Sequence, residues 1–219
     1  MTDFAAEREA MVERQLKRRG ISDPLILDAF LAIPREAFVE SELAHLAYGD
    51  HPLPIAAGQT VSQPFIIAEM IMEADVRPGA QVLEVGAGSG YAAAVIARIA
   101  DRVIAIERQS ELVATAREQL ARLGIANVEI VEGDGSEGWH AEAPFDAILV
   151  AASGSHVPPP LIEQLAPGGR LVMPVGGPGE VQQLVKVTRA EDGTAREETL
   201  CAVRFVPLIG VQGWELDDD

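Results

Sequence analysis

The sequence predicts an α/β fold: a doubly wound, mostly parallel sheet with helices on both faces, a C-terminal antiparallel strand pair and a helical N-terminal segment. Three observations predict it. From residue 79 on, short apolar runs alternate with helical patterns, which is typical of a parallel sheet. The run 145–151 is too apolar for an exposed edge. The last two runs, 183–189 and 199–205, have only a turn between them.

The first third of the chain reads as helical. Residues 4–19 have apolar residues at helical spacing and Gly20 ends the run, while Ser22-Asp23-Pro24 opens a second helix over 25–33. Residues 49–60 are rich in proline and glycine and predict an ordered loop without an element of its own. Ser62 is then expected to cap a helix that runs to about residue 73. We therefore divide the chain into a helical segment, 1–78, packed on an α/β domain, 79–219, in one compact unit.

The α/β part follows in order. Strands are expected at 82–85, 103–106, 128–131, 145–151 and 170–175, and helices at 91–100, 109–123 and 158–165, the last closed by Pro167-Gly168-Gly169. The closing strands, 183–189 and 199–205, are joined by the turn Glu191-Asp192-Gly193.

The composition limits the kinds of partner that the protein can bind and the cellular compartment in which we expect it. The 219 residues include 17 Lys and Arg against 34 Asp and Glu, and the net charge of −17 argues against bulk nucleic-acid binding. The single cysteine excludes an intrachain disulfide, which fits a reducing compartment. No apolar run approaches the roughly 18 residues that a membrane span needs, and the charged N-terminus has no apolar secretion core. We expect a cytoplasmic protein that binds neither nucleic acid nor membranes.

A glycine-rich loop joins the first predicted strand to the next helix. Gly86, Ala87, Gly88 and Gly90 lie where a sheet of this kind binds its ligand, although a tight turn alone also needs glycine. Tyr91 occupies the place where a dinucleotide-binding fold has a small residue, which argues against NAD. A nucleoside triphosphate is disfavoured because no Gly-Lys-Ser/Thr follows.

Acidic residues near three strand ends indicate a different ligand. Glu107 ends the second strand and can accept both ribose hydroxyls of a nucleoside. Glu84 precedes the glycine loop, and Asp134 and Gly135 follow the third strand, where Asp134 could also be a simple turn residue. A diphosphate would be repelled by these carboxylates. A ligand with ribose, adenine and a positive centre would not, and S-adenosyl-L-methionine has these parts.

Several motifs resemble known families. Four stretches of the chain resemble the class I methyltransferases, which have a Rossmann-like sheet. They are Leu83-Glu84-Val85-Gly86-Ala87-Gly88-Ser89-Gly90-Tyr91, Gly133-Asp134-Gly135, Phe145-Asp146-Ala147-Ile148 and Pro167-Gly168-Gly169-Arg170-Leu171-Val172. Three further stretches resemble one family within this class, the protein-L-isoaspartate O-methyltransferases. They are Ile33-Pro34-Arg35-Glu36, Asp50-His51-Pro52-Leu53-Pro54-Ile55 and Gly58-Gln59-Thr60-Val61-Ser62-Gln63-Pro64. The resemblance covers roughly residues 7–210.

The resemblance implies a repair reaction. Such enzymes methylate the free α-carboxylate of L-isoaspartyl residues in damaged peptides and proteins, leaving S-adenosyl-L-homocysteine, and the ester then closes to a succinimide. Because an α-carboxyl ionises at about pH 3.3–3.7, the nucleophile needs no base. Ser62 is our candidate catalytic residue, holding the carboxylate together with Thr60 and Val61. The alternative for Ser62 is helix capping alone.

The remaining expectations concern the cofactor, metals and rival functions. Gln63 is expected to touch the cofactor or neighbouring backbone, and His51 to order its loop, with no metal bound. The rivals are methylation of another peptide or small-molecule carboxylate, and a binding module that does not turn over. Small residues at Ala56, Ala57 and Ala151, and the stretch after Leu208, depart from the family pattern on the substrate side. We expect a monomer.

Overall fold

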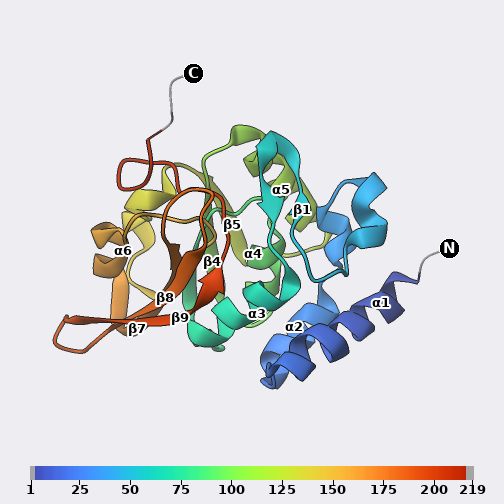
Figure 1. Cartoon of the computed structure of the whole chain (residues 1–219), viewed down its shortest axis with the longest axis horizontal. Helices are drawn as coiled ribbons and strands as arrows, with labels where there is room; N and C mark the ends of the chain where they lie inside the picture. The colour runs from blue at the N-terminus through green and yellow to red at the C-terminus, as the bar shows by residue number, and fades with distance from the viewer. Residues whose placement is uncertain (1–2, 216–219) are drawn as a thin grey trace.

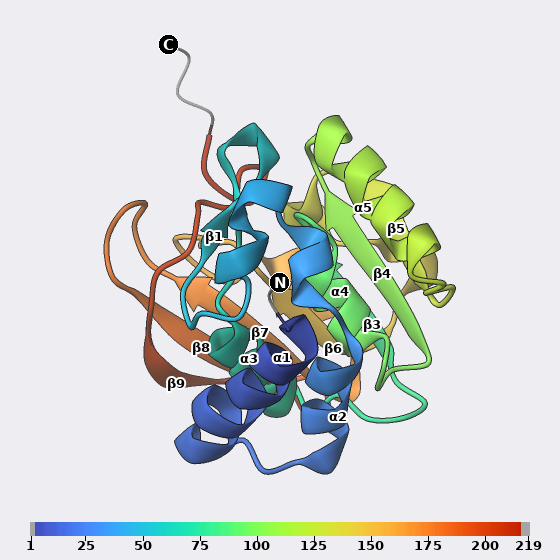
Figure 2. The same cartoon turned by 90° about the vertical axis from the view of Figure 1, so that its right-hand side faces the viewer.

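A seven-stranded sheet forms the centre of the molecule. The computed structural model describes residues 3–215, so the ends of both expected segments, residues 1–2 and 216–219, lie outside it. The strand order is β5-β4-β3-β6-β7-β8-β9, with the first five strands parallel and the last two antiparallel (Figures 1 and 2). The strands are β3 (Gln81–Val85), β4 (Arg102–Glu107), β5 (Val128–Glu132), β6 (Phe145–Val150), β7 (Leu165–Val175), β8 (Gln182–Arg189) and β9 (Ala195–Val203). The predicted fold class is confirmed.

Hydrophobic cores lie on both faces of this sheet. Neighbouring strand residues point to opposite faces, so that Val103 and Ala105 join one core whereas Ile104 and Ile106 join the other. The first core includes residues of three helices, α3 (Pro64–Glu73), α4 (Tyr91–Ile96) and α5 (Ser110–Arg122). The second includes residues of α6 (Pro159–Glu163), and the short turns η6 (Gly135–Glu137) and η7 (His140–Glu142) precede β6. The sheet is therefore covered on both sides, as a doubly wound fold requires.

The N-terminal helices pack into the first core (Figure 1). They are α1 (Phe4–Met11), η1 (Val12–Leu16), η2 (Lys17–Arg19), α2 (Pro24–Ala32), η3 (Arg35–Phe38) and η4 (Ser41–Leu46). Gly20 ends the first run at φ 102°, as predicted, and the Asp23 side chain caps α2 within the Ser-Asp-Pro sequence expected to open it. Phe30 and Phe38 pack edge-on against Tyr91 at ring distances of 6.3 and 5.5 Å. The helical segment thus supports the helix that follows the glycine loop.

The segment before α3 differs from the sequence prediction in two respects. The expected featureless loop contains a two-stranded hairpin, β1 (Leu53–Pro54) and β2 (Thr60–Val61), around the turn η5 (Ala56–Gly58). Ser62 does not cap α3, because the N-cap position is Gln63 and Pro64 is the first helical residue. Proline is favoured at the first helical position because its missing N–H would have no partner there, and with the helix starting at Pro64, Ser62 lies outside it.

Three other element boundaries were predicted wrongly. Helix α4 ends at Ile96 rather than at residue 100. Strand β7 begins at Leu165, since that residue pairs with Phe145, so the Pro-Gly-Gly sequence lies within the strand rather than after a helix. Strand β9 runs from Ala195 to Val203 rather than from 199 to 205, and beyond it the buried Gln182 side chain accepts a hydrogen bond from the Phe205 N–H. In the described part of the chain, no helix is long and apolar enough to cross a membrane.

Candidate active site

The glycine loop wraps over the carboxyl end of β4. Gly86 and Ala87 donate their N–H groups to the Ile106 carbonyl at 2.9 and 3.0 Å. Gly88 has φ 54°, and a β-carbon there would touch only the Ile55 side chain, at 3.4 Å. The loop is therefore an open cradle that needs glycine for its backbone conformation and is covered by the hairpin that carries Ile55.

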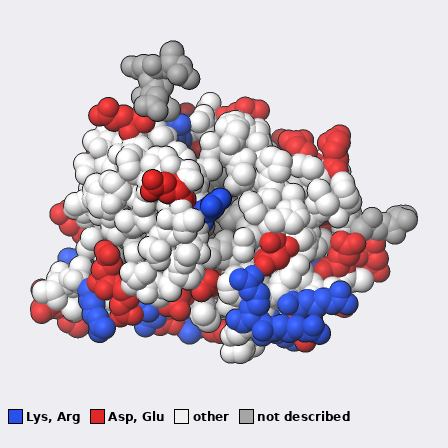
Figure 3. Space-filling model, viewed as in Figure 1, with Lys and Arg blue, Asp and Glu red and all other residues white. Residues whose placement is uncertain are grey.

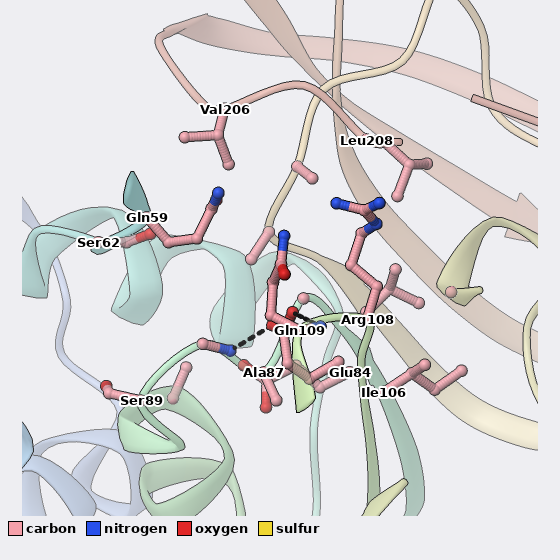
Figure 4. A pocket seen from close by; sticks show the side chains of 18 of the residues that line it. Gln59, Ser62, Glu84, Ala87, Ser89, Ile106, Arg108, Gln109, Val206 and Leu208 are labelled. Atoms are coloured by element: carbon pink, nitrogen blue, oxygen red, sulfur yellow. Dashed lines mark hydrogen bonds between the residues drawn. The ribbon is translucent and has the colours of Figure 1, made fainter. Parts of the chain in front are cut away.

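Glu107 fixes this loop from the end of β4. Its two carboxylate oxygens accept hydrogen bonds from the N–H groups of Gly88 and Gln109, each at 2.9 Å (Figure 4). The side chain is buried and lines the cavity, and each carboxylate oxygen can accept a second hydrogen bond. Glu107 can thus hold the loop and accept a ligand hydroxyl at the same time.

Glu84 is a buried carboxyl with an unused acceptor. It lies in β3, lines the cavity, and its Oε2 atom has no hydrogen-bond partner among the described residues. Burial, together with the neighbouring Glu107 carboxylate, raises the pKa of this carboxyl to about 8. A ligand that brings a positive group to Glu84 would be stabilised by its ionised form.

These residues surround the first of two adjoining cavities (Figure 4). Its volume is about 100 Å³. Sequence reasoning missed several lining residues, of which Arg108 and Gln109 follow Glu107 directly and were within reach of the strand-end argument. The segment Val206–Ile209 could not be predicted from the sequence, because hydrogen bonds between distant residues bring it to the cavity. Ser153 N–H donates to the Val206 carbonyl and Leu208 N–H donates to the Ser153 carbonyl, both at 2.8 Å.

A second cavity of about 530 Å³ adjoins the first. The two share four lining residues, which are Thr60, Ser62, Ala151 and Val206. The residues that line the second cavity include Phe65, Ile66 and Glu69 of α3 and the continuous run 201–206. Ser62, half-buried and free of any capping role, therefore lies where the two cavities meet.

The structure does not bring all predicted site residues to the first cavity. Thr60, Val61, Ser62, Glu84, Gly86, Ala87, Gly88, Glu107 and Gly135 line it. Gln63 instead lines the second cavity, and Gly90 packs against Ala116 below the loop.

Asp134 has the structural environment of a turn residue. Its carboxylate accepts hydrogen bonds from the Ser136 N–H and hydroxyl and from the Val211 N–H, at 2.7–2.9 Å. Burial alone would raise the pKa of Asp134, but these hydrogen bonds outweigh it and hold the pKa below its ordinary value. Asp134 thus anchors the C-terminal segment to the end of β5, and its predicted contact with the cofactor stays a prediction.

The site can be compared with the needs of S-adenosylmethionine. The unpartnered Glu84 oxygen suits a cationic group, Glu107 suits ribose hydroxyls, and the glycine cradle allows close approach of a flat or narrow ligand. The residues present therefore fit that cofactor. Within residues 3–215, no group of three or more His, Cys, Asp or Glu is placed to hold a metal ion, and the His51 ring bonds to the adjacent Pro52 carbonyl at 3.1 Å.

Comparison with solved structures defines the class of protein. A protein-L-isoaspartate O-methyltransferase structure matches with a TM-score of 0.85 and 32% identity, covering 94% of this chain and 67% of that one. A second, from Plasmodium falciparum and in complex with S-adenosyl-L-homocysteine, matches with a TM-score of 0.79 and 28% identity, covering 95% and 99%. The chain has a methyltransferase fold.

Sequence comparisons identify the family. The family model for protein-L-isoaspartate(D-aspartate) O-methyltransferase matches residues 6–213. A protein-L-isoaspartate O-methyltransferase 1 of Rhodopseudomonas palustris is 55% identical over 97% of this chain and 87% of that one, and one numbered 2 of Pelobacter propionicus is 52% identical over 94% and 92%. The chain belongs to the protein-L-isoaspartate O-methyltransferase family, which confirms the resemblance noted in its sequence.

Proposed function

We propose that this enzyme transfers a methyl group from S-adenosylmethionine to the free α-carboxylate of L-isoaspartyl residues in peptides and proteins, and so starts their repair through a succinimide. The observation that carries the proposal is the meeting of two cavities at Ser62. One has the acidic and glycine residues that suit the cofactor, and the other offers a volume of about 530 Å³ for the peptide. The same family name on relatives of high identity does not favour methylation of an unrelated carboxylate.

The chain's own residues bind, orient and exclude water. When bound, the cofactor supplies an electrophilic methyl group on a sulfonium. Glu84 and Glu107 would hold the cofactor's polar groups. Ala151 and Val206 place apolar side chains beside Thr60 and Ser62 at the junction and so limit the water there. The Ser62 hydroxyl donates a hydrogen bond to the substrate carboxylate and directs one of its oxygens toward the first cavity.

The proposed reaction needs no general base from the protein. The substrate carboxyl is ionised near neutral pH because its ordinary pKa is about 3.3–3.7. Consistently, neither cavity has a histidine among the residues that line it in the described part of the chain. Alignment of the two reactants alone can contribute about 7–11 kcal/mol to the rate enhancement. Catalysis here is a matter of position and of water exclusion.

We further propose that the enzyme acts as a monomer in the cytoplasm and does not bind nucleic acid. A net charge of −17 supports the last point, because it repels phosphate backbones. A single cysteine, Cys201, supports a reducing compartment. Sedimentation of the purified chain, alone and with DNA or RNA, checks the oligomeric state and the absence of nucleic-acid binding.

A paired-peptide assay tests the reaction. The enzyme is incubated with methyl-labelled S-adenosylmethionine and two peptides that differ only in an isoaspartyl or an aspartyl linkage. We expect label on the isoaspartyl peptide alone, followed by loss of methanol as the succinimide closes. Equal labelling of both peptides, or of neither, contradicts the proposal.

A further inference from the structure

The loop of residues 206–214 closes one side of the first cavity. Its first part, Val206–Ile209, lines the cavity, and Figure 4 shows Val206 and Leu208 on the side away from the glycine loop. Residues 206–214 contain no charged side chain, and the surface over this loop is uncharged in Figure 3. The position of the loop therefore depends on hydrogen bonds and packing rather than on ion pairs of its own side chains.

Both ends of the loop are bonded to one peptide carbonyl. Ser153 follows β6 and is fully buried. Its carbonyl oxygen accepts a hydrogen bond from Leu208 N–H and another from the Trp214 indole Nε1–H, each at 2.8 Å. A carbonyl oxygen has two lone pairs, so these two bonds use both of them. The indole thus ties the end of the loop to the residue that also holds its beginning.

The backbone of the loop is shaped for this closure. Trp214 N–H donates to the Leu208 carbonyl at 2.7 Å, and Gly210 N–H donates to the Trp214 carbonyl at 3.2 Å. A β-carbon on Gly213 would overlap the Leu208 carbonyl oxygen, so the close approach before Trp214 requires glycine. Leu208 and Trp214 are therefore held together by the main chain as well as through Ser153.

Trp214 lies outside both cavities. It is half-buried and is not among the described residues that line either one. Any effect of Trp214 on the reaction must therefore pass through Leu208 and its neighbours, which do line the first cavity.

We propose, resting on the proposed function that gives the first cavity to S-adenosylmethionine, that Trp214 is a positioning residue for this cofactor. By closing the loop on Ser153, the indole keeps Val206–Ile209 in place as a wall that is formed before the cofactor arrives. Cofactor binding then does not have to order this segment, and a preformed site binds more tightly than one that the ligand must order.

Trp214→Phe removes the indole N–H and keeps an aromatic ring. In this variant the wall is less ordered without cofactor, so part of the binding free energy is used to order it. We expect the dissociation constant for S-adenosyl-L-homocysteine, measured by calorimetry, to rise about fivefold, as the loss of one neutral hydrogen bond gives. Trp139→Phe is the matched control, because Trp139 packs against the second core and lines neither cavity. It should keep the wild-type dissociation constant.

Gly213→Ala tests the same closure from the backbone side. It keeps the indole but displaces Leu208 from Trp214, and we expect the same weakening of S-adenosyl-L-homocysteine binding. Hydrogen exchange then locates the effect. In both variants without cofactor, amides of residues 206–214 should exchange faster than in wild type while β3 and β4 are unchanged, and S-adenosyl-L-homocysteine should remove most of the difference.

A folded Trp214→Phe variant with the wild-type dissociation constant contradicts the proposal, and so does an equal rise in Trp139→Phe. A raised KM for the isoaspartyl peptide with normal S-adenosyl-L-homocysteine binding would assign Trp214 to the substrate and overturn it as well. If the variants do not fold, the wild-type enzyme decides. S-adenosyl-L-homocysteine should slow hydrogen exchange in residues 206–214, because a ligand held by the closed loop opposes its opening. Exchange that the ligand does not change contradicts the proposal.

The failure of this inference is distinguishable from failure of the proposed function. If wild-type enzyme binds S-adenosyl-L-homocysteine but does not methylate the isoaspartyl peptide, the proposed function is wrong, whatever Trp214→Phe does to binding. If it methylates that peptide, and Trp214→Phe binds S-adenosyl-L-homocysteine as wild type does, only the role of Trp214 is wrong.

Discussion

The buried Glu84 carboxyl makes the stability of the cofactor-free enzyme dependent on pH. Its pKa is raised from 4.5 to about 8, chiefly by burial, so the folded state retains a proton that the unfolded state loses. Stability is therefore lost as pH rises from about 4.5 to 8. With about 1.4 kcal/mol per pKa unit, the cost of this group is about 1 kcal/mol at pH 5.5 and about 4 kcal/mol at pH 8.

Glu84→Gln isolates this effect. The amide has the same shape and does not titrate, so its own desolvation cost is the same at every pH. We expect the free energy of unfolding of the variant, measured with denaturant in the absence of cofactor, to gain about 3 kcal/mol relative to wild type between pH 5.5 and pH 8. Glu118→Gln, at an exposed position on α5, is the matched control and should show no such gain. A difference between Glu84→Gln and wild type that does not change with pH refutes the reasoning.

Three further substitutions test the site. Glu107→Ala removes the acceptor that holds Gly88 N–H. Since a charge-assisted bond contributes about 1.5–3 kcal/mol, we expect the dissociation constant for S-adenosyl-L-homocysteine, measured by calorimetry, to rise at least tenfold. An unchanged constant would show that Glu107 is not part of the cofactor site. Ser62→Ala should lower kcat for the isoaspartyl peptide by roughly tenfold and leave the affinity for S-adenosyl-L-homocysteine nearly unchanged. Because Ser62 caps no helix, the melting temperature should also stay nearly the same. A lower melting temperature with normal kcat would assign Ser62 a structural role. Gly135→Ala places a methyl group in overlap with Val85, so thermal unfolding should show a loss of about 1–3 kcal/mol, and full wild-type stability would contradict the packing described.

Most of the fold was predictable because its signals are local. The alternation of apolar strands with helical patterns and the turn at Gly193 each lie within a few residues, and the glycine loop with Glu84 and Glu107 follows from the rule that ligands bind at strand ends. Arg108 is adjacent to Glu107 and lines the same cavity, but the strand-end argument singles out acidic residues and glycines only.

The remaining features depend on contacts between distant residues. The role of Asp134 as an anchor depends on Val211, 77 positions away, which no local pattern reveals. Ser62 looked like a helix cap because serine is a preferred N-cap residue, and only the position of Gln63 as the N-cap shows otherwise. The segment that begins at Val206 reaches the cavity through Ser153, so its part in the site follows from tertiary structure alone.

A crystal structure of this enzyme with S-adenosyl-L-homocysteine and an isoaspartyl peptide tests the central claim most directly, namely that a carboxylate is held at the junction of two cavities. We predict the nucleoside beside Glu107 in the first cavity and the substrate α-carboxylate within hydrogen-bonding distance of the Ser62 hydroxyl. A peptide carboxylate bound away from Ser62, or a nucleoside in the second cavity, would contradict the account.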